Sequence, residues 1–185
     1  MQFSPWPQME SKDNIIEKGL ALHLDFNPED PKFMKASREY EEIWDSEGAR
    51  IVQAVEHETG LNFQEQSIKA LVYEGISKAG YKESPMKLRA SYSSDTKKAT
   101  LIHELGHRII AQIKNRPEDL DEHKILFLFL YDVWRSLYGT DFANHMVAVE
   151  SKRRGVYDYE SAWKWAMSST VEERKKRFQE LVTNL

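Results

Sequence analysis

Hydrophobic residues recur every three or four positions over residues 32–59, the spacing that gathers them on one face of a helix. The members of this stripe are Phe33, Ala36, Tyr40, Ile43, Trp44, Ile51 and Val55. Gly60 follows directly, and glycine readily takes the left-handed conformation that closes a helix. The pattern predicts a long amphipathic helix, either continuous or divided at Gly48.

Two segments rich in strand-forming residues follow this helix, over residues 67–77 and 86–93. Gly80 and Pro85 mark a connection between them. We therefore expect the two segments to form an antiparallel pair. A further short strand is expected over residues 21–26, where apolar and polar residues alternate.

The second half of the chain reads as helical. After a helix that runs to about residue 114, Pro117 suits the first position of a new helix. That second helix should extend to about Tyr138, and its nearly all-round apolar character predicts burial. Asp132 lies within it and needs a partner, such as Arg135 or Arg108. Three more helices are expected over residues 141–154, 157–167 and 171–184, the last opened by a capping box of Thr170 and Glu173.

Composition narrows the class of protein. The chain has 185 residues, 41% hydrophobic and 30% charged, with a net charge of −4 and no cysteine. Disulfides and cysteine-based zinc sites are thus excluded, and the charge argues against nucleic-acid binding. The longest apolar run, residues 125–131, is too short to span a membrane, and the N-terminal residues lack the features of a signal peptide. We expect a soluble, cytoplasmic protein that does not bind membranes.

The chemistry concentrates in the sequence His103-Glu104-Leu105-Gly106-His107. Histidines four positions apart on a helix project from the same face, so both imidazoles can bind one Zn²⁺ ion. Glu104 can then reach a water at the metal without being a ligand itself. Small and apolar neighbours indicate that this helix is buried, and Gly106 would let another segment approach it closely. This spacing is the HExxH pattern of zinc hydrolases, with two ligands and a general base on one element.

A catalytic zinc site needs three protein ligands and one open position. If the helix that begins near Pro117 folds back on the HExxH helix, residues one or two turns later reach the level of the two histidines. The polar residues there include Glu122 and His123. The residues alone therefore leave the third ligand open between these two.

Over residues 95–138 the chain resembles the HExxH zinc metallopeptidases, the zincin superfamily. HELGH followed by His123 and then Phe127 is similar to the SprT-like peptidases, which would make His123 the third ligand. The minimal gluzincins instead use a glutamate on the helix after HExxH, which would be Glu122. We prefer His123. Arg108 departs from the pattern, because such peptidases usually carry an uncharged residue after the second histidine.

The resemblance implies an α+β fold, mostly helical, with a small antiparallel sheet packed on the HExxH helix and helices at the C-terminal end. We expect one zincin-like domain over residues 1–185, with a catalytic core over 13–138 and a helical extension over 139–185. The implied substrate is a peptide or protein, paired with an edge strand at Met86–Tyr92.

The implied activity is zinc-dependent peptide hydrolysis, with Glu104 as general base. An additional oxyanion donor is expected, and the available residues are Tyr92, Tyr131, His145, Tyr157 and Tyr159. The alternative function is a non-catalytic zinc-binding module or a helical protein-interaction module. The sequence makes no prediction of oligomeric state or cleavage specificity.

Overall fold

A three-stranded sheet and seven α-helices make up the computed structural model, which describes residues 22–155 and 157–183. The strands are β1 (His23–Pro28), β2 (Ser67–Tyr73) and β3 (Met86–Arg89). The helices are α1 (Met34–Thr59), α2 (Ser94–Ile110), α3 (Glu122–Phe127), α4 (Leu130–Tyr138), α5 (Thr140–Ser151), α6 (Tyr159–Met167) and α7 (Val171–Val182), with a 3-10 turn η2 at Pro31–Phe33. The predicted domain boundary at residue 13 lies outside the described residues.

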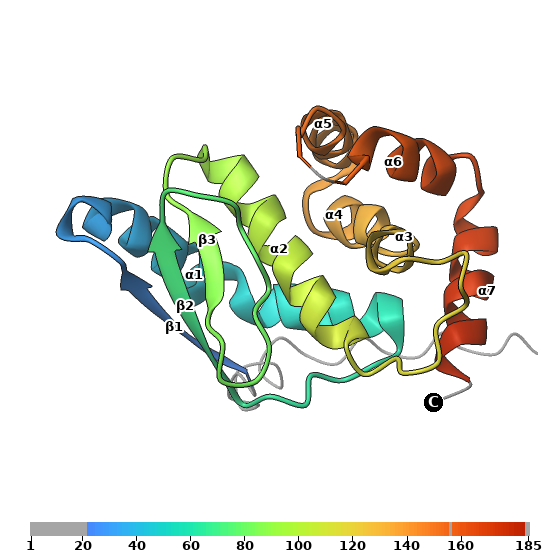
Figure 1. The fold of residues 1–185 in the computed structure, drawn as a ribbon, viewed down its shortest axis with the longest axis horizontal. Coiled ribbons are helices and arrows are strands. Elements are labelled where there is room, and N and C mark those ends of the chain that lie inside the picture. Colours follow the sequence, from blue (N-terminus) through green and yellow to red (C-terminus); the bar gives the residue numbers. More distant parts are fainter. Residues whose placement is uncertain (1–21, 156, 184–185) are drawn as a thin grey trace, which may run out of the picture.

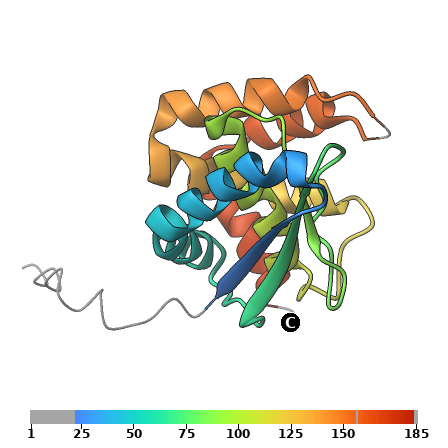
Figure 2. The same cartoon turned by 90° about the vertical axis from the view of Figure 1, so that its left-hand side faces the viewer.

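The helices are arranged in layers beside the sheet. Helix α2 lies between the sheet and the group α3 to α7, and the long α1 crosses behind it (Figure 1). Turned by 90°, the strands and α1 lie in front of the other helices (Figure 2). Alternate residues of β2 point into this interface, and Ile68, Ala70 and Val72 are all buried there. The mixed, mostly helical class is as predicted.

The sheet is parallel throughout, in the order β1-β2-β3, so the predicted antiparallel pairing was wrong. A connection of about a dozen residues is long enough to return the chain to the start of a parallel neighbour. Residues 74–85 make this return along the free edge of β3. Their one antiparallel pairing with the strand is an isolated bridge between Lys78 and Lys87.

Helix α1 is continuous through Gly48 and ends as predicted. Gly60 has φ of 68°, in the left-handed region, and its N–H donates to the carbonyl of Glu56. Helix α2 begins at Ser94, because the side chain of Ser93 accepts from the N–H of Thr96. It ends at Ile110 rather than near residue 114.

The second core helix predicted from Pro117 to Tyr138 is in fact two helices. Residues 117–120 form only a turn, in which the N–H of Leu120 donates to the carbonyl of Pro117. Helix α3 starts at Glu122 because the Asp121 side chain accepts from the N–H of Lys124. The predicted burial is confirmed: every residue from 125 to 134 is buried.

A buried ion pair joins α4 to α7. Asp132 is 1% exposed, and its carboxylate accepts from Arg174 Nη2 at 2.8 Å. Of the two predicted partners, Arg135 also contacts this carboxylate, at 3.2 Å, but its side chain is 40% exposed, whereas Arg108 pairs with Glu65 instead. The predicted capping box of Thr170 and Glu173 opens α7 and so fixes the turn that carries Arg174.

The two arginines on Asp132 make a matched pair for a stability test. Arg174→Met leaves a buried carboxylate without its main partner, and we expect this to lower the free energy of unfolding by about 3–5 kcal/mol. Arg135→Met removes a solvent-exposed contact and should cost about 1 kcal/mol or less. Urea unfolding followed by tryptophan fluorescence measures both. Equal losses would contradict the assignment of Arg174 as the main partner.

Candidate metal centre

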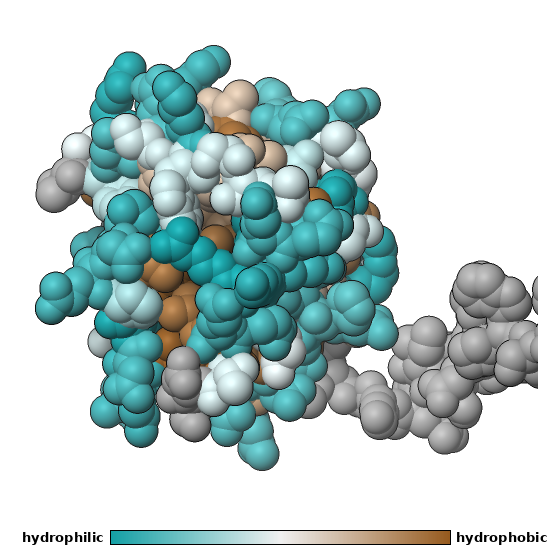
Figure 3. All heavy atoms as spheres, turned by 90° about the vertical axis from the view of Figure 1, so that its right-hand side faces the viewer, coloured by the Kyte–Doolittle hydropathy of each residue, from teal (hydrophilic) through white to brown (hydrophobic). Residues whose placement is uncertain are grey.

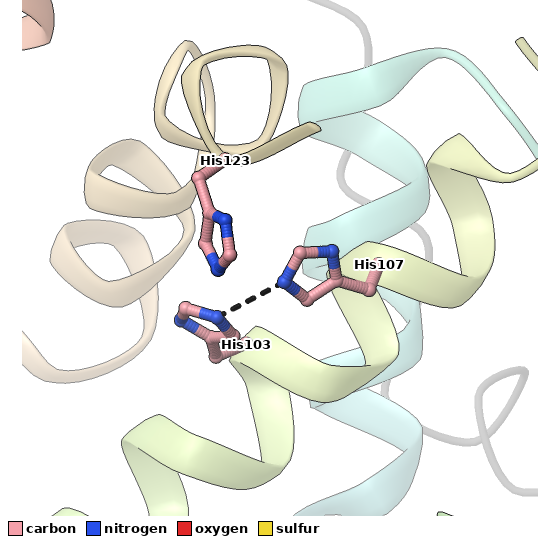
Figure 4. A group of neighbouring side chains, drawn as sticks. All are labelled: His103, His107 and His123. Atoms are coloured by element: carbon pink, nitrogen blue, oxygen red, sulfur yellow. Dashed lines mark hydrogen bonds between the residues drawn. The ribbon is translucent and has the colours of Figure 1, made fainter. Parts of the chain in front are cut away.

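Three histidines from two helices point at one another (Figure 4). His103 and His107 lie one turn apart on α2, and their Nε2 atoms are 3.1 Å apart. His123 comes from the first turn of α3. One ligand nitrogen from each lies within 4.8 Å of the others, close enough to bind a metal ion.

The close packing of α3 on α2 brings His123 to this point. Gly106 lies between the two histidines of α2, and a Cβ atom added there would overlap Leu126 of α3. The prediction that Gly106 permits a close approach is therefore confirmed. Glu122, the alternative third ligand, lies beside the group, and its oxygen contacts the far side of His107.

Carboxylates fix the orientation of both α2 histidines. Glu150 of α5 lies 2.8 Å from Nδ1 of His103, and Glu122 lies 2.9 Å from Nδ1 of His107. An ionised carboxylate accepts hydrogen bonds, so these contacts favour the tautomers that carry the proton on Nδ1 and turn the Nε2 lone pairs toward each other. The two Nε2 atoms lie 3.1 Å apart, at hydrogen-bonding distance (dashed line in Figure 4), so they can share one proton or bind one cation.

The two carboxylates are themselves held in place. Glu150 is 1% exposed, and it accepts from Trp163 Nε1 at 3.0 Å and contacts Arg153 at 3.4 Å. Burial alone would raise the pKa of Glu150, but the charges of its partners and its hydrogen bonds hold it below the usual value. Hydrogen bonding from His107 lowers the pKa of Glu122 to about 2 against the effect of burial. Both groups therefore remain ionised at neutral pH.

His123 is packed between aromatic rings. Its imidazole stacks on Tyr157 with the ring centroids 4.2 Å apart, and its Nε2 lies 3.1 Å from the hydroxyl of Tyr159. Burial, followed by the neighbouring histidines, lowers the pKa of His123 to about 3. The ring is therefore neutral at neutral pH, which is the form that binds metal ions.

Glu104 is buried at the base of the same group. It is 3% exposed, and burial raises the pKa of its carboxyl although His103 and His107 act in the opposite direction. Together with the three histidines and Tyr159 it lines a cleft of about 510 Å³. The centre is therefore accessible to a ligand although most of its side chains are buried.

The connection between β2 and β3, residues 74–85, forms the opposite wall of the cleft. Arg108 of α2 binds this connection. The Arg108 guanidinium donates from Nε to the carbonyl of Ala79 at 2.8 Å and from Nη2 to the carbonyl of Ser84 at 3.1 Å. It also pairs with Glu65. The unusual arginine after the second histidine thus fixes the cleft wall relative to the metal centre.

The structure distinguishes among the predicted oxyanion donors. Tyr159 lines the cleft, whereas Tyr157 covers the back of His123. Tyr131 bonds to Asn144, and His145 is exposed on α5. Tyr92 lies over Arg89 and Arg153.

Sequence reasoning missed Glu150 and Trp163, which support His103 from α5 and α6. Both come from the part of the chain predicted as a C-terminal extension, so the centre is completed by that region. The only signal available in the sequence was the spacing of Glu150, which places it on the apolar face of α5.

Comparisons with known proteins give no match: no family model matches the sequence, no curated protein matches it, and no solved structure matches the fold. Among the described residues, no helix has the length and apolar character needed to cross a membrane.

Metal binding can separate the roles of His123 and Glu122. We expect the wild type to bind about one Zn²⁺ per chain and His123→Ala to lose most of this affinity, because a ligand is removed. Glu122→Gln removes only the carboxylate behind His107 and should weaken binding about 10- to 100-fold. Competition with a chromophoric chelator measures both affinities, and circular dichroism checks that each variant is folded. Loss of the metal in Glu122→Gln alone would make Glu122 the third ligand.

Proposed function

We propose that this protein is a zinc-dependent metallopeptidase, with zinc bound by His103, His107 and His123. The observation that carries the proposal is the convergence of two oriented imidazole lone pairs beside a buried carboxylate, Glu104, in an open cleft. A structural metal site needs the ligands but has no need for such a carboxylate or for access from solvent.

The donor set suits zinc. With Zn–N bonds of about 2.0–2.1 Å and tetrahedral angles, ligand nitrogens lie about 3.3 Å apart, close to the 3.1 Å between His103 and His107. Three neutral imidazoles leave a fourth position for water or substrate. When bound, Zn²⁺ supplies Lewis acidity, which polarises a carbonyl oxygen and lowers the pKa of water to about 7.

Glu104 is the proposed general base. Its carboxylate shares the cleft with the three histidines, and burial raises its pKa, which makes it a stronger base than an exposed carboxylate. In the proposed reaction it accepts a proton from the attacking water and returns it to the leaving amine. Tyr159 is the proposed oxyanion donor, since its hydroxyl lies 3.1 Å from His123 Nε2 and faces the same cleft.

The proposed substrate is an extended peptide that lies along residues 77–81 rather than along β3. The edge of β3 is already partly covered, since Lys78 pairs with Lys87 and the N–H of Arg89 donates to Ser77 Oγ. Residues 77–81 lie outward of β3, joined to it by the bridge of Lys78, and all of them line the cleft. Backbone pairing at a sheet edge gives affinity with little dependence on side chains.

Glu104→Gln tests the proposed function directly. We expect peptide hydrolysis to fall by about 10²- to 10⁴-fold, because the amide cannot accept the proton, while zinc affinity stays close to that of the wild type. Turnover of fluorogenic peptides, together with zinc content, measures both quantities. If the wild type cleaves no peptide when loaded with zinc, and Glu104→Gln changes nothing, the site is a non-catalytic zinc-binding module.

Tyr159→Phe tests the oxyanion donor. Removing one such donor should lower kcat by about 10²- to 10³-fold with little change in KM, because the hydrogen bond forms mainly in the transition state. Tyr157→Phe is the matched control, since its hydroxyl bonds to Asp121 and it does not line the cleft. Equal losses of kcat in the two variants would contradict a specific role for Tyr159.

A further inference from the structure

A second hollow lies beyond the His107 end of the metal centre. It encloses about 440 Å³, and its lining includes Phe63, Tyr81, Arg108 and Ala111. Ala111 follows His107 by four positions, and its N–H donates to the His107 carbonyl, so the helical geometry continues to this point. Four helical residues advance by about 6 Å. The hollow therefore begins one helical turn beyond a proposed metal ligand.

Tyr81 stands between this hollow and the cleft that contains the histidines, because its side chain lines both. The residue belongs to the connection between β2 and β3, and its hydroxyl donates to Glu122, the first residue of α3. The ring thus extends from the connection to the helix that carries His123. The hollow and the cleft are therefore two compartments of one groove beside α2, and the Tyr81 ring is the wall that they share.

The polar groups around the hollow are engaged by the protein itself. The Arg108 guanidinium donates to two carbonyls of the connection and pairs with Glu65. The side-chain amide of Gln112 donates to the carbonyl of Asn62. Lys82 is exposed, and a lysine can lay its alkyl stem on apolar surface while its ammonium group stays in water. A polar ligand would have to compete with these contacts, so the hollow offers it little.

Apolar surface remains open to solvent in this compartment. The rings of Phe63 and Tyr81 and the methyl group of Ala111 line it. Tyr81 is 45% exposed, and it is one of the few large hydrophobic residues in the described part of the chain that face solvent. By contrast, the side of the molecule that carries α6 and α7 is mainly hydrophilic (Figure 3). Burial of carbon surface is therefore the main source of free energy for a ligand in the hollow.

We propose that this hollow is a substrate subsite that receives an apolar side chain, such as that of leucine or phenylalanine. The inference rests on the proposed peptidase function and specifies its substrate class. A peptide that lies along residues 77–81 reaches Tyr81 at one end of this segment. An extended peptide advances about 3.3 Å per residue, so a hollow that begins about 6 Å along α2 suits the side chain about two residues from the scissile bond. Its volume lies within the range of about 300–1,000 Å³ that is typical of ligand pockets.

Phosphinic peptides test the subsite without turnover, because a phosphinate in place of the central peptide bond can bind zinc and so fixes the register of the peptide. The fluorescent probes differ only in the residue two positions before or after the phosphinate, which is Leu, Phe or Asn. By fluorescence anisotropy with the zinc-loaded wild type, we expect Leu and Phe to bind about tenfold more tightly than Asn, on one side of the phosphinate only. High salt should leave this ratio unchanged, because salt screens charges and not apolar contacts.

Ala111→Gln fills the hollow with a long side chain from an exposed position at the end of α2. It should bring the ratio of the Asn and Leu dissociation constants close to one, while the affinity for zinc stays close to that of the wild type. Lys114→Gln is the matched control, because it introduces the same side chain nearby but outside the lining of both compartments. It should keep the preference for Leu.

Substitutions of Tyr81 separate the role of its ring from that of its hydroxyl. Tyr81→Phe keeps the apolar wall and loses the bond to Glu122, so the preference for Leu should persist. Tyr81→Ala removes the wall and should reduce the preference about threefold or more. Each ratio compares two probes on the same zinc-loaded protein, so a change in zinc affinity does not enter it.

Each outcome decides between the two proposals. A preference for Leu that Ala111→Gln removes, without any peptide cleavage by the wild type, supports the subsite and overturns the peptidase function. Cleavage with equal affinity for the Leu and Asn probes overturns the subsite and keeps the peptidase. A preference that survives in Ala111→Gln overturns the assignment to this hollow, and so does an equal preference on both sides of the phosphinate. Absence of both binding and cleavage overturns both proposals.

Discussion

The convergence of the Nε2 atoms of His103 and His107, which lie 3.1 Å apart, is the constraint on which the rest of the centre depends. Glu150 and Glu122 support it, because they lie 2.8 and 2.9 Å from the Nδ1 atoms on the opposite sides of the two rings. Without these carboxylates either ring could rotate or change its tautomer. With them, a cation between the rings would satisfy both nitrogens, and its binding would then be coupled to folding.

Much of the fold serves to hold these carboxylates. Glu150 is carried by α5 and is fixed by Trp163 of α6, whose ring stacks on Phe127 of α3 at 3.8 Å. The helix that supplies His123 is therefore packed against α6, which holds the carboxylate beside His103. Arg174 of α7 in turn binds Asp132 at the start of α4. The C-terminal helices are thus part of the framework of the centre.

The sequence predicted those parts that depend on local spacing. Three features follow from residues that lie within one or two helical turns of each other along the chain. They are the end of the long helix at Gly60, the capping box at Thr170 and the pairing of His103 with His107. The direction of β3 could not be read in this way. A twelve-residue connection with glycine and proline is compatible with a wide hairpin or with a return along the strand edge, and only the fold as a whole decides between them.

The helix predicted from Pro117 failed for a similar reason. Its apolar run is real, but Asp121 caps a new helix and so overrides the start that Pro117 allowed. This later start places His123 in the first turn of α3, where it can face α2. Glu150 was out of reach because its role is defined by a contact 47 positions away in the chain, which no spacing rule connects.

Arg108, the charged residue that follows the second histidine of the HExxH pattern, has a structural role in the cleft. An uncharged residue after the second histidine would leave the carbonyls of Ala79 and Ser84 without their donor on α2. The connection of residues 74–85 has little regular structure to stabilise it, apart from the bridge to β3. Anchoring it through a buried guanidinium keeps the cleft wall at a fixed distance from the histidines. In this chain the same helix therefore positions both His103 and His107 and the surface that faces them.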